Sequence, residues 1–109
     1  MITPRQDQRV IGAQADQVLI TDHGKLLYMK GSGAQVLTCP VVRRLDGASP
    51  GFTVDVYNAG PENLTIVPRA GQTVQGGADL TVASQRGVRL TLAPGGEDWI
   101  VFRPPRAPP

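Results

Sequence analysis

The residue types that most often carry catalysis are scarce in this chain. His23 is the single histidine and Cys39 the single cysteine among 109 residues. His23 lies between Asp22 and Gly24, residue types that tolerate the backbone angles of a turn, so we interpret it as a turn residue. With one residue of each type, no Ser/His or Cys/His constellation, intrachain disulfide or cysteine-based metal site can be assigned. Cys39 is expected to be a buried, inert thiol.

The acidic residues and the paired glycines do not complete a catalytic motif either. No two carboxylates stand in the arrangement of a glycosidase, and the glycine pairs at 76–77 and 95–96 lack the following helix and the lysine of a phosphate loop. The carboxylates fall at turns or at outward strand positions: Asp55, Glu62, Asp79, Glu97 and Asp98. We predict that the protein is not an enzyme and that it holds no cofactor and no metal.

Length and composition indicate one small domain with little helix. Thirteen glycines and ten prolines interrupt every stretch that could continue a helix. No apolar run approaches the roughly 20 residues of a membrane span, and the N-terminus lacks the apolar core of a signal peptide. The formal charge is +2, with the basic excess in the terminal segments. We therefore expect a soluble chain made in the cytoplasm that binds neither membrane nor nucleic acid.

Residues 51 to 102 consist of short alternating runs separated by glycine, proline or asparagine. Phe52, Val54 and Val56 fall on one side of an extended segment, and the intervening polar residues fall on the other. The same alternation recurs at 64–66, 80–82, 88–92 and 98–102. It predicts an all-β fold, an antiparallel β-sandwich of the jelly-roll type with roughly eight to ten strands. Trp99 and Val101 should point into its core.

The N-terminal half contains three further apolar runs, at residues 18–21, 25–30 and 34–40, which predict three further strands. The polar residues 1–17 are interpreted as an extended arm, residues 18–103 as the β-sandwich domain, and residues 104–109 as an exposed, proline-rich tail. In the run at 25–30, Leu26 and Tyr28 share one face while Leu27 and Met29 share the other. Both faces are apolar, which is typical of a strand that is covered twice.

Several short motifs occur in a fixed order between residues 15 and 103. Gly24-Lys25 precedes an apolar strand, a second strand ends at Pro40, and the chain continues with GFTVDVYN, LTIVP, GQTVQG, LTV, GVRLTL and GEDWIV. This succession resembles a β-module of bacteriophage virion surface proteins, which occurs in head fibres, head decoration proteins and head spikes and also in tail fibres. The resemblance implies a virion component that is usually a homotrimer or, at a fivefold vertex, a pentamer.

The short chain around this module favours a structural role on the particle head. We expect a head decoration protein or a head spike or fibre (base) subunit, made in the bacterial cytoplasm and displayed on the virion surface of a phage or phage-like particle. Its partners would be other copies of itself and a capsid protein or another virion protein. The alternative is a carbohydrate-binding module for a host surface polysaccharide, although the chain has few aromatic residues. An intracellular regulatory or inhibitor domain has no feature in its favour.

Apolar residues that one small sandwich cannot cover indicate where copies of the chain would meet. The candidate interface residues are Leu27, Met29, Ile100 and Phe102, because the last two oppose Trp99 and Val101 in the final strand. The candidate capsid-binding arm contains Arg5, Arg9, Val10 and Ile11, and several arms held by one oligomer would bind with avidity.

Overall fold

The computed structural model describes residues 8–40, 51–69 and 71–103, except for the side chain of Ile20. These residues form ten β-strands and one single-turn 3-10 helix, η1. Their bounds are β1 (Gln8–Ile11), β2 (Ala15–Gln17), η1 (Ile20–Asp22), β3 (Leu26–Met29), β4 (Gln35–Thr38), β5 (Thr53–Asn58), β6 (Leu64–Val67), β7 (Thr73–Val74), β8 (Leu80–Val82), β9 (Arg86–Leu92) and β10 (Asp98–Phe102). The predicted all-β class and the scarcity of helix are confirmed.

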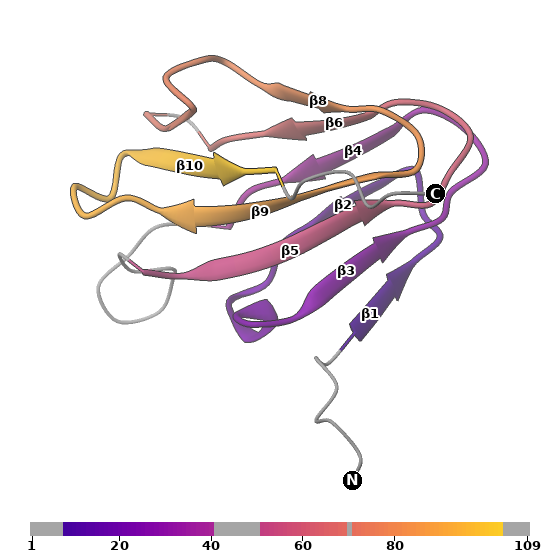
Figure 1. Cartoon of the computed structure of the whole chain (residues 1–109), viewed down its shortest axis with the longest axis horizontal. Coiled ribbons are helices and arrows are strands. Elements are labelled where there is room, and N and C mark those ends of the chain that lie inside the picture. The colour runs from indigo at the N-terminus through magenta and orange to yellow at the C-terminus, as the bar shows by residue number, and fades with distance from the viewer. Residues whose placement is uncertain (1–7, 41–50, 70, 104–109) are drawn as a thin grey trace, which may run out of the picture.

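The strands belong to two mixed sheets. The six-stranded sheet has the order β1-β3-β5-β9-β10-β7, and the four-stranded sheet has the order β2-β4-β6-β8. Figure 1 shows β3, β5 and β9 side by side in one layer, with β4, β6 and β8 in the other. The apolar side chains that the two sheets bury form one cluster.

The chain crosses from one sheet to the other after β1, after β3 and after β5. After each crossing the chain forms one strand in the second sheet and then goes back to the first sheet. The strand that it forms there runs in the same direction as the previous strand of that sheet. β1, β3 and β5 are mutually parallel, and so are β2, β4 and β6. The antiparallel pairs β5–β9, β9–β10 and β6–β8 involve the C-terminal strands. In the second half β7 pairs in parallel with β10. The expectation of an antiparallel fold is therefore wrong for the first half of the chain and for β7, and a sandwich of the jelly-roll type stays a prediction.

The core contains the residues that the alternating runs place on the inner side. Trp99 is fully buried, and its ring meets Phe52 edge-on with the centroids 5.9 Å apart. Val54, Leu90 and Leu92 are buried with it, and Val101 is 8% exposed. The predicted inward orientation of Trp99 and Val101 is confirmed.

The buried side-chain amides of Asn58 and Gln35 form hydrogen bonds with the backbone of the segments that connect the two sheets. Asn58 at the end of β5 donates from Nδ2 to the carbonyl oxygens of Glu62 (2.8 Å) and Val82 (2.9 Å). Its Oδ1 accepts from the Gly60 N–H (3.1 Å) and from Gln35 Nε2 (3.4 Å). Gln35 Oε1 in turn accepts from the Gly31 N–H at 2.9 Å. These bonds satisfy backbone groups that would otherwise be buried without partners.

The predicted boundaries of the N-terminal segments are wrong in two places. The run at 18–21 is not a strand, because the chain leaves β2 there and enters η1. Residues 8–17 are not an arm either: β1 pairs with β3, and β2 pairs with β4. Residues 1–7 of the predicted arm and the predicted tail at 104–109 lie outside the described residues.

Candidate binding face on the six-stranded sheet

On each long strand of the six-stranded sheet, every second side chain points away from the core. The buried members of these strands include Leu27, Val56, Leu90 and Val101, so the residues between them point outward. We call this surface the outer face and define it by Val10, Leu26, Tyr28, Thr53, Asp55, Tyr57, Arg89, Thr91, Ile100 and Phe102.

Strand register aligns the aromatic residues of the outer face. Val10 is paired with Tyr28, Tyr28 with Tyr57, and Tyr57 with Gly87. The two tyrosine rings stack with centroids 5.7 Å apart and an interplanar angle of 22°. A Cβ atom on Gly87 would lie 3.5 Å from Tyr57 Cδ1 and 3.3 Å from the Val56 carbonyl oxygen, so the ring of Tyr57 lies close to a position without a side chain.

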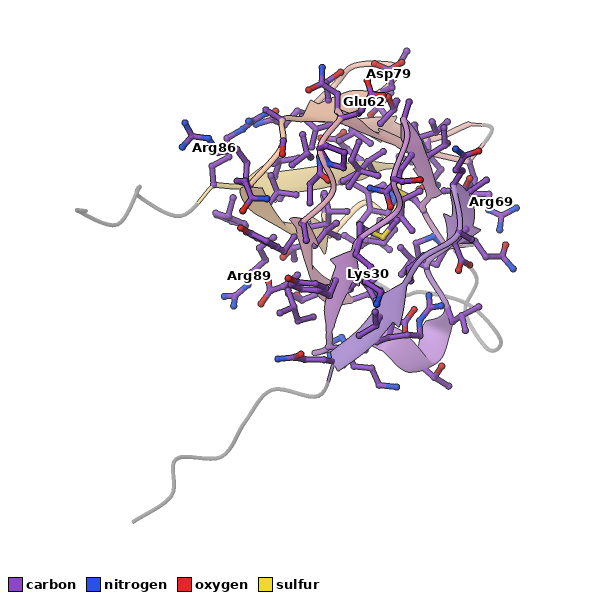
Figure 2. All side chains as sticks on the ribbon, turned by 90° about the vertical axis from the view of Figure 1, so that its right-hand side faces the viewer. Lys30, Glu62, Arg69, Asp79, Arg86 and Arg89 are labelled. Atoms are coloured by element: carbon purple, nitrogen blue, oxygen red, sulfur yellow. The ribbon has the colours of Figure 1, made fainter. Side chains whose placement is uncertain are left out.

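An ion pair occupies the middle of the outer face. Arg89 Nε donates to Asp55 Oδ1 at 2.6 Å, and Arg89 Nη2 donates to Oδ2 at 3.1 Å. This hydrogen bonding and the opposite charge of Asp55 raise the pKa of Arg89. Figure 2 shows Arg89 and Arg86 extending from one side of the molecule and Arg69 from the opposite side. The two charges of the pair are balanced within the chain, and a contacting surface need not supply a counter-ion.

The outer face contains an open groove of about 760 Å³. Apolar and aromatic side chains from β3, β5 and β10 line it together with the Asp55–Arg89 pair. Beside the pair, the hydroxyl oxygens of Thr53 and Thr91 lie 3.2 Å apart and are hydrogen-bonded. A groove of this size and lining can accept either apolar side chains or the ring of a small ligand.

The exposed apolar side chains of the outer face lie in two groups near the two ends of the strand order, one on β1 and β3 and the other on β10. Val10 (56% exposed) and Tyr28 (37%) lie on β1 and β3, and Phe102 (54%) and Ile100 (37%) lie on β10. The outward side of the four-stranded sheet differs, because Val36 is its one exposed large apolar residue among those described, and Thr65 and Thr81 follow across the strands. An exposed apolar surface that is concentrated on one sheet indicates a contact surface.

The structure places the four candidate interface residues in two different environments. Ile100 and Phe102 lie on the outer face, as the sequence predicts. Leu27 and Met29 are fully buried in the chain's own core, so we withdraw them as contact residues. The sequence shows that both sides of β3 are apolar, but the inner side is the one with Leu27 and Met29. Leu26 and Tyr28 occupy the outer side.

The candidate arm residues are likewise divided. Arg5 lies outside the described residues, whereas Arg9, Val10 and Ile11 belong to β1. Ile11 is buried in the core. Arg9 binds the fully buried carboxylate of Asp22 through Nε (3.1 Å) and Nη2 (2.8 Å). Val10 is the member whose side chain is left exposed.

Sequence reasoning missed Tyr57, Asp55 and Arg89 as parts of one surface. The alternation within 52–57 and 88–92 does place these residues on the polar side of their runs, and that was the available signal. Their juxtaposition depends on the register of β5 with β9, in which Asp55 is paired with Arg89. A single sequence does not contain that register.

The two residues with catalytic potential are occupied by structural roles. His23 Nδ1 accepts a hydrogen bond from the Thr53 N–H at 3.0 Å, and the imidazole contacts Phe52 at a centroid distance of 5.4 Å. Cys39 is buried, and burial raises the pKa of its thiol to about 12. Among the described residues, no group of three or more His, Cys, Asp or Glu side chains could hold a metal ion.

Comparison with known proteins does not assign this chain to a family. No protein-family model matches it, and a search of curated proteins finds no match. No helix in the part of the chain that the structure describes is long and apolar enough to cross a membrane.

Proposed function

We propose that this protein is a structural subunit of a phage or phage-like particle, a head decoration protein or a head spike or fibre (base) subunit at the virion surface. The observation that carries the proposal is the exposed apolar outer face of the six-stranded sheet. The order of motifs between residues 15 and 103 supplies the virion context. The proposal includes a sandwich of the jelly-roll type, which the single apolar cluster shared by both sheets supports and the parallel strand pairs do not favour.

The outer face favours a closed homo-oligomer, a trimer or a pentamer. Its apolar side chains lie at two lateral ends, near β1 and on β10, with the Asp55–Arg89 pair between them. In a ring of three or more copies, each copy contacts its neighbours through two different surfaces. The β10 end of one copy, with Ile100 and Phe102, would cover the Tyr28 end of the next. The assembled ring would then bind a capsid protein or another virion protein.

The oligomer is tested by measuring the native mass of the purified protein. We expect a closed oligomer for the wild type and, for Phe102→Asp, loss of the ring with no species larger than a dimer, because a carboxylate would be buried in the contact without a partner. Thr81→Asp is the matched control, since Thr81 is exposed on the outward side of the four-stranded sheet; it should keep the wild-type mass. A wild-type protein that remains monomeric at high micromolar concentration would overturn the proposal.

A second candidate function is the binding of a host surface polysaccharide in the groove. The observation that favours it is the Tyr28–Tyr57 ring stack beside the Asp55 carboxylate and the Arg89 guanidinium, groups that contact sugar rings and hydroxyls. Titration of the pure protein with host capsular polysaccharide, followed by calorimetry, tests it. Heat that is released by the wild type and lost in Tyr57→Ala, with the native mass unchanged, would establish this function over the first.

A further inference from the structure

We propose that the free edge of β1 pairs with β1 of a second copy, in antiparallel orientation about a twofold axis. The contact would extend the six-stranded sheet from one copy into the next. It goes beyond the proposed function and does not depend on it, because its hydrogen bonds are made by backbone groups at the sheet edge, whereas the proposed ring is formed through the side chains of the outer face.

Among the described residues, the backbone of β1 has no strand partner on the side away from β3. β1 is the end strand of its sheet, and the Lys30 N–H donates to the Ile11 carbonyl oxygen at 2.9 Å. Ile11 therefore points its backbone groups towards β3. Because these groups alternate along a parallel strand, Gln8 and Val10 point theirs to the free side. Within the described residues, no hydrogen bond engages the Val10 N–H or C=O.

The neighbouring edge strand of the other sheet is capped by side chains. Gln17 in β2 donates its backbone N–H to Asp16 Oδ1 at 2.7 Å, and its carbonyl oxygen accepts from Arg9 Nη2 at 2.9 Å. Natural sheets block edges with such devices to prevent unwanted pairing. The remaining described end strands, β7 and β8, are only two and three residues long. β1, with four residues, is the longest of the described end strands.

The charge of Arg9 does not protect the β1 edge. Its guanidinium turns between the sheets, where it binds Asp22 at 2.8 Å and lies 3.6 Å from Asp16. The side chains of β1 that point outward, Gln8 and Val10, are uncharged. A second strand can approach without the like-charge repulsion that usually keeps sheet edges apart.

The chemistry of this edge fits a second copy of itself. When two β1 strands meet with Val10 opposite Val10, each valine donates its N–H to the other and accepts at its C=O, which is the hydrogen-bonded pair of an antiparallel ladder. Gln8 then lies opposite Gly12. A Cβ atom built on Gly12 meets nothing within 4 Å, so there is room at this position for the Gln8 side chain of the second copy. The two Val10 side chains lie on the same face and cover each other, which removes from water the most exposed of the large apolar side chains described.

Disulfide cross-linking tests the pairing. In such a pair the Cα atoms are about 5.5 Å apart, within the range of a disulfide. We expect Val10→Cys to form a covalent dimer under mild oxidation, with a yield at least about tenfold above that of Ala15→Cys, the matched cysteine on the capped β2 edge. The buried Cys39 does not compete, because its pKa of about 12 keeps the thiol neutral.

A second variant removes the donor without adding a cysteine. Val10→Pro lacks the edge N–H but leaves the β1–β3 pairing intact, so the native mass should fall by a factor of two while the circular dichroism spectrum is unchanged. Equal cross-linking of both cysteine variants, or a native mass that does not respond to Val10→Pro, overturns the pairing. Cross-linking of Val10→Cys in the Phe102→Asp background should persist, which separates this edge contact from a failure of the proposed ring.

Discussion

Replacing Trp99 with alanine tests how the core supports the outer face. Trp99 is fully buried in β10, next to the outward Ile100, and its ring meets Phe52 at 87°. A buried aromatic side chain removes about 150–250 Å² from water. At about 25 cal/mol per Å² this corresponds to about 4–6 kcal/mol, an upper estimate because the unfolded chain is already partly collapsed. We expect Trp99→Ala to lower the free energy of unfolding by about 3–5 kcal/mol.

The measurement is urea unfolding followed by circular dichroism, since the variant lacks the chain's single tryptophan and its fluorescence. Trp99→Phe is the control. Trp99 Nε1 is buried without a hydrogen-bond partner among the described residues, so phenylalanine keeps a ring and removes an unpaired donor. We expect Trp99→Phe to lower the free energy of unfolding by less than about 1.5 kcal/mol. If Trp99→Ala unfolded within about 0.5 kcal/mol of the wild type, the ring would be exposed, and the polysaccharide-binding function would gain support.

Two further perturbations address the buried polar groups. Asn58→Ala should lower the free energy of unfolding by at least about 2 kcal/mol, because the Val82 and Glu62 carbonyls lose their donor and each buried group left unpaired costs about 1–3 kcal/mol. A decrease below about 0.5 kcal/mol in urea unfolding would contradict the role of these hydrogen bonds. Cys39 should resist Ellman's reagent at pH 8 until the chain unfolds. Burial raises the pKa of Cys39 from 9.0 to about 12, so the folded state prefers the neutral thiol. The contribution of this thiol to the free energy of unfolding is complete below about pH 9 and is lost between pH 9 and 12. Cys39→Ala should lack this part of the pH dependence.

The alternation of side chains predicts most strands but not their partners. Phe52, Val54 and Val56 are buried as the period-two pattern requires, and the runs at 80–82 and 98–102 coincide with strands β8 and β10. β1 escapes this reasoning because its sequence, QRVI, contains only two apolar residues. It is a strand because β3 offers it hydrogen bonds in register. Pairings between residues far apart in sequence depend on three-dimensional packing that local patterns do not specify.

Two of the four predicted interface residues lie on the outer face, and the other two do not, for a related reason. In β10 the inner and outer sides differ clearly, since Trp99 and Val101 are the residues that the core requires, and Ile100 and Phe102 are left outside. In β3 the sequence LLYM offers two apolar sides of similar size. Only the position of β3 between β1 and β5 decides that Leu27 enters the core.

The placement of these residues separates stability from association in this chain. Phe102 is half exposed in the single subunit, so its substitution removes little buried surface and should act on assembly alone. Leu27, by contrast, is fully buried, and Leu27→Asp would place an unpaired carboxylate in the core and unfold the subunit before any contact between copies is affected. Two residues of the same sheet therefore give different phenotypes, loss of assembly or loss of folding, according to the side of the sheet from which they project.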